Sequence, residues 1–272
     1  MGILININRE KCIGCGLCSV DCLTNAIAME GDTPVVDNDK CIDCAHCLAV
    51  CPMSAVSMPK YNKNEIIEYD KKKFTIDPDK LMNAIKFRRS IRKFKKQKIE
   101  KEKIDAIIEA GRYTPTGSNK QGNRYIILDE KLEELKLVAM QGLHDLAIEN
   151  SETMKPVMLY RDKFESMQRV YTETGKDMLF YNAPTIIIVV NDRDAIINGA
   201  LAASNMELML NALGLGACYI GFFVRAVSIV PKLRDVLGLK KNEEIAAVLA
   251  VGYPDIEYKR TTNRKSANVT IM

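Results

Sequence analysis

The chain has 272 residues, 47% of them apolar, and a formal net charge of +4. This exceeds one small domain and suffices to bury full cores, so we expect two domains. No apolar run reaches the roughly 18–20 residues that span a bilayer, and Met1–Asn6 has neither the basic start of a secretory signal nor a myristoylation motif. We therefore expect a soluble, cytoplasmic protein.

Eight of the nine cysteines form two copies of one spacing, CxxCxxCxxxC. Two-residue gaps let three thiolates surround one cuboidal cluster, and in two-cluster proteins the last cysteine of each run binds the other cluster. We therefore expect two [4Fe-4S] clusters, one on Cys12, Cys15, Cys18 and Cys51 and the other on Cys41, Cys44, Cys47 and Cys22. The alternatives are zinc, which usually takes two CxxC pairs across a longer loop, and disulfides, which are typical of small secreted chains.

The duplication extends beyond the cysteines. An offset of 29 residues also superimposes Lys11-Cys12-Ile13 on Lys40-Cys41-Ile42 and Met29 on Met58. Residues 1–60 therefore resemble a bacterial-type two-cluster ferredoxin domain, which implies two βαβ-like halves packed around the clusters. One departure is that Leu23 follows the first run where Pro52 follows the second, which predicts a looser turn after Cys22.

Charge is distributed unevenly along the chain. Residues 1–60 contain 4 Lys/Arg and 7 Asp/Glu, and the remainder contains 35 and 28. The acidic part could dock on a basic surface, either of the second domain or of an electron donor. Ordinary surface composition is the alternative interpretation.

A hydrophilic stretch follows, and we interpret residues 61–77 as a linker and 78–272 as the second domain. Asp77-Pro78 is typical of an N-cap followed by proline at the first helical position. This predicts a helix over 78–89 with Leu81, Met82 and Ile85 on its apolar face. A second helix is expected over Lys101–Gly111.

Four short segments of the second domain carry candidate chemistry. They are Arg88-Arg89-Ser90-Ile91-Arg92-Lys93-Phe94, Tyr113–Gln121, Gly214–Phe223 and Val251-Gly252-Tyr253-Pro254. Arginine forks beside a serine hydroxyl suit a terminal phosphate, although a basic run alone is more often a solvated face and sometimes binds nucleic acid. The loop at 113–121 consists of small and hydrogen-bonding residues, which suit a flat polar ring edge or simply a flexible turn.

In this order and spacing the four segments resemble the nitroreductase family of FMN enzymes over about residues 79–272. The resemblance implies an α+β fold with a mainly antiparallel central sheet, a homodimer built on long helices, and FMN at the subunit interface. The chain agrees with that outline through strand-like runs at Tyr125–Leu128, Thr185–Val190, Ala217–Phe222 and Ala246–Val251. A helix between Ala195 and Leu213 is apolar on nearly every side, which predicts burial, either in the dimer or in a monomer core.

The resemblance also implies which residues bind FMN. Those expected at its phosphate and ribityl chain are Arg88, Arg89, Ser90, Arg92, Arg264 and Lys265. Those expected along the isoalloxazine are Pro115, Thr116, Gly117, Asn119 and Gln121, with the backbone of Ile220 and Gly221 along the N5 edge. Gly122-Asn123 departs from the family pattern, so the pocket wall there is not predicted.

We assign no catalytic side chain, because the reactive atoms of a flavin enzyme belong to the cofactor. Tyr219 and Phe222 are candidates for the substrate face. Cys218 is interpreted as a buried small apolar residue, and His46 and His144 have no visible catalytic partner. Arg161 and Tyr171 are more consistent with surface or core roles than with substrate contact.

The expected function is an oxidoreductase in which the two clusters deliver electrons to FMN and an organic acceptor, such as a nitroaromatic or a quinone, is reduced. The electron donor would be reduced ferredoxin or NAD(P)H. Alternatives are a flavin, ene or dehalogenating reductase on the same scaffold, and an electron-transfer module that serves a protein partner. Nucleic-acid binding through residues 86–98 is the least favoured interpretation.

Overall fold

The structure, a computed structural model, describes residues 4–128, 131–149 and 158–272. The N-terminal segment Met1–Asn6, in which no export signal is expected, is thus described only from residue 4 onward. The chain divides into two compact units, residues 1–75 with 116–120 and residues 76–115 with 121–272, and each is considered by itself. No helix within the described ranges is long and apolar enough to cross a membrane.

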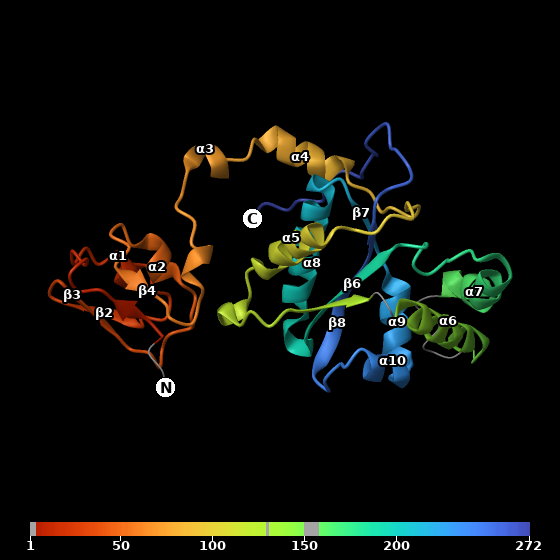
Figure 1. The fold of residues 1–272 in the computed structure, drawn as a ribbon, viewed down its shortest axis with the longest axis horizontal. Helices are drawn as coiled ribbons and strands as arrows, with labels where there is room; N and C mark the ends of the chain where they lie inside the picture. The colour runs from red at the N-terminus through yellow and green to blue at the C-terminus, as the bar shows by residue number, and fades with distance from the viewer. Residues whose placement is uncertain (1–3, 129–130, 150–157) are drawn as a thin grey trace. The chain divides into compact units, whose positions relative to one another are not determined.

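The first unit consists of two strand–helix–strand halves, as the internal repeat predicted (Figure 1). Its elements are β1 (Asn6–Ile7), α1 (Leu17–Val20), β2 (Ile27–Glu30), β3 (Thr33–Val36), α2 (His46–Val50) and β4 (Val56–Ser57). Strand β1 of the first half pairs antiparallel with β4 of the second, and β2 pairs antiparallel with β3. The pairing of β1 with β4 joins the two halves. A small core of Ile5, Ile27, Val56 and Met58 lies between them.

The segment expected as a linker contains local structure. A 3-10 turn at Lys63–Glu65 (η1) and helix α3 (Lys71–Phe74) lie in it, and the first unit extends to residue 75. Helix α4 (Pro78–Phe87) begins as predicted, because the Asp77 carboxylate accepts the backbone N–H of Lys80 at 2.8 Å. The helix ends two residues before the expected position, since Arg88 adopts extended dihedrals. Its apolar side chains remain accessible, Leu81 at 40% and Met82 at 48%.

The second unit is built on one four-stranded sheet in the order β5-β6-β8-β7, with every neighbouring pair antiparallel. The strands are β5 (Arg124–Leu128), β6 (Thr185–Asp192), β7 (Gly216–Tyr219) and β8 (Glu243–Gly252). The predicted antiparallel sheet is therefore confirmed. The strand expected at 217–222 is wrong at its end, because β7 stops at Tyr219 and Gly221 already begins helix α9 (Gly221–Ile229).

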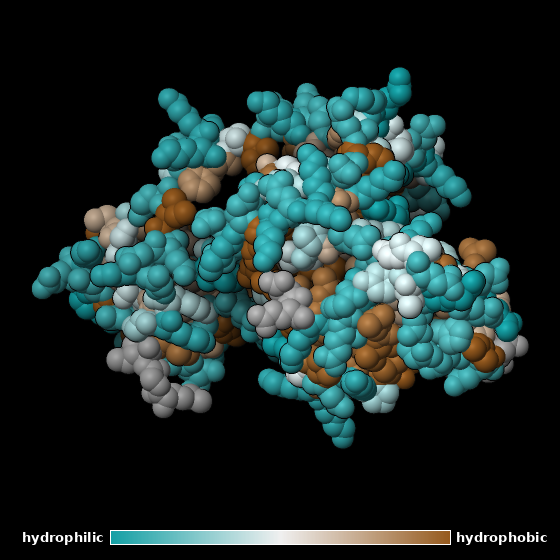
Figure 2. Space-filling view, turned by 45° about the vertical axis from the view of Figure 1, so that its right-hand side comes forward, coloured by the Kyte–Doolittle hydropathy of each residue, from teal (hydrophilic) through white to brown (hydrophobic). Residues whose placement is uncertain are grey.

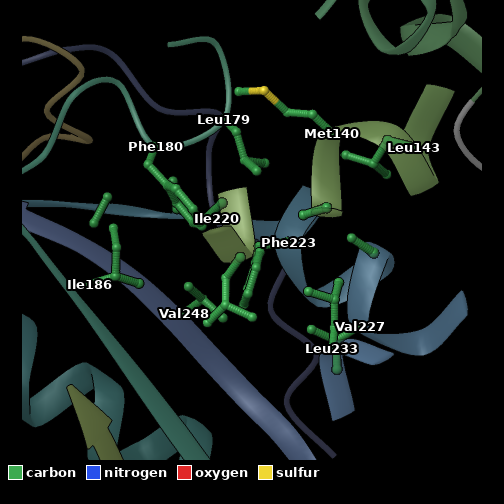
Figure 3. Packing of buried hydrophobic residues seen from close by; sticks show 14 of the residues in the cluster. Met140, Leu143, Leu179, Phe180, Ile186, Ile220, Phe223, Val227, Leu233 and Val248 are labelled. Atoms are coloured by element: carbon green, nitrogen blue, oxygen red, sulfur yellow. The ribbon is translucent and has the colours of Figure 1, made fainter. Parts of the chain in front are cut away.

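Helices cover both faces of this sheet (Figure 1). On one face lie α5 (Lys101–Arg112) and α8 (Ile196–Ala212), and on the other lie α6 (Leu132–Glu149), α7 (Arg161–Thr174), α9 and α10 (Pro231–Val236). Successive β6 residues alternate between the two cores, Ile187 toward α8 and Ile186 and Ile188 toward α9, as the period of two requires. Figure 3 shows the core beside α9, where Phe223 packs among side chains of α6, α10 and the sheet.

The apolar helix predicted over 195–213 is α8. Ala202, Ala203 and Met206 are fully buried against the sheet and α5. The helix nevertheless leaves Ile197 at 70% and Leu201 at 47% exposure, four residues apart on its outer side. The single chain alone therefore does not bury every side of α8, and its burial in a dimer, the favoured interpretation, stays a prediction.

Candidate functional site

The eight cysteines of the repeat line two small cavities in the first unit. Cys12, Cys15, Cys18 and Cys51 line one of them. Cys22, Cys41, Cys44 and Cys47 line the other. Each cavity thus receives three cysteines from one run and the last cysteine of the other run, the same two sets that the crossed ligand pattern predicts.

The remaining walls of both cavities are mainly apolar. Leu17, Met29 and Val56 line the first, and Ile5 and Met58 the second. Burial raises the pKa of the Cys47 thiol to about 11. Within the described residues, no group of three His, Cys, Asp or Glu side chains is arranged to hold a single metal ion. Two sets of four thiols among mainly apolar walls fit iron–sulfur clusters, in which each thiolate binds a different iron.

The turns after Cys22 and Cys51 have the same geometry. The N–H of Ala26 lies 3.2 Å from Cys22 Sγ, and the N–H of Ala55 lies 3.3 Å from Cys51 Sγ. The residue before each of these alanines, Asn25 or Ser54, has a positive φ. The looser turn expected from Leu23 in place of Pro52 is therefore not present. N–H···S contacts of this kind tune the potential of a bound cluster.

The two cysteine runs differ in one respect that the sequence did not reveal. Gly14 and Gly16 have positive φ in the first run, and their equivalents in the second run are Asp43 and Ala45, with φ of 55° and 61°. Side chains that rarely adopt this conformation are therefore tolerated there. The Asp43 carboxylate accepts from Lys60 at 2.5 Å, and this pairing raises the pKa of Lys60.

Both histidines have polar partners, although the sequence indicated no catalytic partner for either. His46 Nδ1 lies 3.1 Å from a carboxylate oxygen of Asp21. His144 Nδ1 lies 2.9 Å from the carbonyl of Glu165 on the neighbouring helix. Neither partner forms a catalytic arrangement, so the absence of an assigned role for these histidines stands.

In the second unit, the arginine segment lies alongside strand β7 as an extended chain. Ser90 bridges Ala217 in parallel, and the N–H of Ile91 donates to the Ala217 carbonyl at 2.8 Å. Gly216 permits this approach, because a Cβ there would lie 2.3 Å from Ile91 Cγ1. The glycine of the 214–223 motif therefore positions the arginine segment.

The predicted phosphate residues fall into two groups. Arg88 and Arg89 line a cavity of about 350 Å³ beside α8. Arg89 donates to the Thr262 hydroxyl at 2.9 Å, and Arg264 donates to the same hydroxyl at 2.9 Å. The structure thus brings Arg89 and the tail arginine together, 175 positions apart in the chain.

The cavity beside α8 contains features that fit an anionic group. Arg88 Nε is buried without a hydrogen-bond partner within the described residues. Its Nη1 donates to Glu207 at 2.6 Å, a partner on α8 that sequence reasoning missed. A phosphate oxygen would satisfy the orphaned Nε, since buried guanidinium donors are costly to leave unpaired.

Arg92 lies apart from this group. Its guanidinium is 5.9 Å from the centroid of the Tyr181 ring. Ser90 and Lys265 are exposed. The cofactor residues of the 88–92 segment are therefore not all gathered at one point.

The loop predicted to line the isoalloxazine is divided between the two units. Pro115 and Gln121 belong to the second, and Thr116, Gly117 and Asn119 are grouped with the first. Within the first unit, the side chain of Asn119 donates to the Asp43 carbonyl at 2.7 Å. The position of these three residues relative to Ile220 and Gly221 therefore stays a prediction.

Of the two residues predicted at the flavin N5 edge, only Gly221 retains an available donor. The N–H of Ile220 donates to the Val248 carbonyl at 2.9 Å, which fixes the end of β7 to β8. Gly221 is the first residue of α9, where backbone N–H groups lack intrahelical partners. A Cβ at Gly221 would meet no atom within 4 Å, so packing within the protein does not require a glycine at this position.

One cluster near this helix start was not predicted at all. The Lys163 ammonium lies 4.7 Å from the centroid of the Phe222 ring and 5.7 Å from that of Tyr181. Tyr160 packs edge-on against Phe222, with ring centroids 4.9 Å apart. No sequence signal marks Lys163, because a lysine on an amphipathic helix is most often solvated.

The other candidates have structural roles. Arg161 pairs with Glu165 one turn along α7 at 2.7 Å, and the Tyr171 hydroxyl donates to Glu133. Cys218 is buried, as expected, at 3% exposure. Burial raises the pKa of its thiol, and the charge of Arg92 lowers it in part.

Comparisons with known proteins agree with this geometry. The nitroreductase family model matches residues 85–253, and a model of the 4Fe-4S dicluster domain matches residues 5–58. An FMN reductase (NADPH) of Bacillus subtilis is 28% identical over 61% of this chain and 62% of its own. An NADPH-dependent oxidoreductase of Staphylococcus saprophyticus is 29% identical over 64% of each chain. The chain therefore matches less than two thirds of the length of these relatives.

Among solved structures, a nitroreductase with bound FMN from Bacteroides fragilis superposes with a TM-score of 0.56. It is 25% identical, and the match covers 71% of this chain and 98% of the other. The region that the nitroreductase family model matches, residues 85–253, includes the sheet, the helices on both its faces and the arginine segment. Because the family model spans more than half of its length, the chain belongs to the nitroreductase family and carries an N-terminal region of the 4Fe-4S dicluster type.

Proposed function

We propose that this protein is an FMN-dependent oxidoreductase that receives electrons through two [4Fe-4S] clusters and reduces an organic acceptor such as a nitroaromatic or a quinone. The observation that carries the proposal is the convergence of eight cysteines on two cavities in crossed sets of four. A protein that reduced FMN directly from a nicotinamide would not require these two cysteine sets. The family membership of the second unit supplies the flavin part.

The cluster ligands in this proposal are the eight cysteines of the repeat. All nine cysteines of the chain are free thiols in the structure. Thiolate clusters of this type suit a reducing compartment, which supports the cytoplasm as the place of action. Iron–sulfur clusters transfer one electron at a time, and their potentials depend on burial and on N–H···S contacts.

FMN would be held at its phosphate by Arg88, Arg89 and Arg264, whose donors face the cavity or the Thr262 hydroxyl. Ser90, Arg92 and Lys265 stay in the proposed set. The orphaned Nε of Arg88 is the feature that supports a bound anion most directly.

The ring would lie along Pro115, Thr116, Gly117, Asn119 and Gln121, with Gly221 rather than Ile220 as the N5 donor. When bound, FMN supplies the chemistry that accepts electrons singly and passes them on in pairs. The protein contributes orientation and an N–H dipole at the start of α9.

The electron donor is proposed to be a reduced ferredoxin, with NAD(P)H as the alternative that the names of the two curated relatives favour. Fusion of the cluster unit to the flavin unit raises the effective concentration of one near the other. The acidic balance of residues 1–60 would suit a basic donor surface.

We further propose a homodimer in which α8 forms part of the interface. Ile197 and Leu201 lie on its outer side at 70% and 47% exposure. Figure 2 shows apolar side chains reaching the surface in patches between hydrophilic ones. Apolar residues four apart on a helix form one continuous contact stripe, and light scattering of the purified protein measures whether two chains associate.

The proposed function is tested by anaerobic purification with iron, sulfide and flavin quantification, followed by stopped-flow reduction of the flavin. About eight irons and one FMN per chain, with fast flavin reduction by ferredoxin and turnover of a nitroaromatic, are the expected results. Fast reduction by NAD(P)H alone would reverse the proposed electron route. Fast reduction without small-molecule turnover would identify an electron-transfer module, and transfer to free FMN would identify a flavin reductase.

A further inference from the structure

Two cations of the second unit share one aromatic cluster, and among the described residues neither has a carboxylate within ion-pair distance. The cluster consists of Lys163 on α7, Arg92, Tyr160, Tyr181 and Phe222. Lys163 Nζ lies over the Phe222 ring at 4.7 Å and near Tyr181 at 5.7 Å, and the Arg92 guanidinium is 5.9 Å from the same tyrosine ring. Both positive charges therefore lie within 6 Å of the centroid of the Tyr181 ring.

The charge of Lys163 is incompletely compensated. No carboxylate in the described part of the chain lies within ion-pair distance of its ammonium. Burial lowers the pKa of Lys163, and the charge of Arg92 lowers it further. Asp177, whose charge partly offsets this lowering of the pKa of Lys163, is engaged with Lys136 at 3.3 Å and with the N–H groups of Leu179 and Phe180.

The half-buried ammonium is held in place by its surroundings. Phe222 packs at right angles against the buried Phe164 and edge-on against Tyr160, with centroids 4.9 Å apart in both pairs. Asp177 fixes the backbone that carries Tyr181, which has a positive φ of 60°. A preorganised cation next to exposed aromatic edges suits a ligand that combines a flat ring with a negative charge.

The cluster lies beside the proposed flavin edge. Phe222 directly follows Gly221, the residue that we place at the flavin N5 position. Tyr160 is 41% exposed, so the aromatic edges can be reached from solvent.

We propose that Lys163 makes the acceptor site selective for planar acceptors that carry a carboxylate. This inference rests on the proposed function, because it names the class of acceptor for the same site. A carboxylate placed beside the Lys163 ammonium would gain a charge-assisted hydrogen bond, and its ring would stack on Tyr160 and Phe222. Neutral acceptors of the same shape would gain only the stacking.

The test uses the FMN-loaded, cluster-containing protein and two non-reacting probes of equal shape, benzoate and benzamide. Binding is followed by perturbation of the flavin absorption and by calorimetry. Wild-type protein should bind benzoate about tenfold or more tightly than benzamide, a difference typical of one charge-assisted contact. Lys163→Gln should remove most of that preference and leave benzamide affinity unchanged, and Lys163→Arg should retain it.

Lys241→Gln is the matched control, because Lys241 is exposed and the variant loses the same charge. Its preference for benzoate should equal that of wild type. The proposal is overturned if Lys163→Gln keeps the benzoate preference, or if it weakens both probes equally. Loss of FMN from Lys163→Gln would instead place this lysine in the flavin site.

Failure of the proposed function would show differently, since wild-type protein would then contain no FMN. In that case calorimetry with the apoprotein still measures the benzoate preference and its dependence on Lys163. A benzoate preference without FMN would sustain the anion site alone, and no preference in FMN-loaded wild-type protein would refute the acceptor assignment alone.

Discussion

The approach of the arginine segment to strand β7 depends on the absence of one side chain, at Gly216. An alanine Cβ there would lie 2.3 Å from Ile91 Cγ1, 3.0 Å from Ile91 Cβ and 3.2 Å from Pro254 Cγ. Ile91 is 5% exposed, so it cannot rotate freely into solvent. Overpacking of this kind costs about 1–3 kcal/mol, and the stiffer unfolded chain of Gly216→Ala offsets about 0.4–1 kcal/mol of it.

We therefore expect Gly216→Ala to lower the stability of the second unit by about 1–2 kcal/mol, or about 2–6 °C in its melting temperature. The substitution should also lower the affinity for FMN, because displacement of Ile91 shifts Arg88 and Arg89. The assay is circular dichroism melting of the apoprotein together with FMN titration by quenching of flavin fluorescence.

A double-mutant cycle isolates the clash. Ile91→Ala alone should destabilise by about 2–5 kcal/mol through cavity formation. In the Ile91→Ala background, Gly216→Ala should lower the free energy of unfolding by about 1 kcal/mol less than in the wild-type protein, because Ile91 Cγ1, the closest atom, is then absent. Gly221→Ala is the control that should leave the melting temperature unchanged, since its Cβ would meet nothing within 4 Å. Additive effects of Gly216→Ala and Ile91→Ala would refute the reasoning.

Three further predictions concern the cofactors and the core. Replacement of Arg88 and Arg92 together by glutamine should release FMN, with a loss of affinity of about tenfold or more per arginine, and leave the iron content unchanged. Cys51→Ser should remove the cluster held by the first cysteine run, not the second, as electron paramagnetic resonance and iron analysis would show. Lys136→Met should destabilise the protein by about 3–5 kcal/mol in denaturant melts, because it leaves the fully buried Asp177 carboxylate with backbone N–H donors but without its cation. Burial lowers the pKa of Lys136, but the nearby Glu133 and Asp177 outweigh the effect of burial, and the pKa is raised overall. The stabilisation by the charged lysine is therefore fully present below the pKa of an unfolded lysine. It is lost as the pH rises through the raised pKa of the folded protein.

Each of these has its own contradicting result. Retained FMN in the double arginine variant would refute the phosphate site, and Arg193→Gln, which removes an exposed arginine, should not alter FMN binding. Loss of the cluster on Cys41, Cys44 and Cys47 in Cys51→Ser would refute the crossed ligand sets. A constant difference between wild type and Lys136→Met up to strongly alkaline pH would refute the assigned role of the ammonium.

Much of the fold could be predicted because its signals are local. The cysteine spacing predicts the crossed sets, and the continuous apolar runs at 185–190 and 246–251 predict the two central strands, since a strand that is covered on both faces is apolar at successive positions. The Asp77-Pro78 pair predicts the start of α4, because the cap acts on the next three residues. Errors occurred at element ends, as at Ile220, where tertiary hydrogen bonding to Val248 decides between strand and helix.

The sequence by itself determined which residues can bind iron, which segments can form strands and which arginines are candidates for a phosphate, because these properties depend on side-chain chemistry and on near neighbours in the chain. Only the tertiary structure decided that Arg88 meets Glu207, that Arg89 and Arg264 share the Thr262 hydroxyl, and that Lys163 lies over Phe222. Those contacts join residues 59 to 175 positions apart. Such pairings arise from helix packing on the sheet, and a single sequence contains no periodic signal for them.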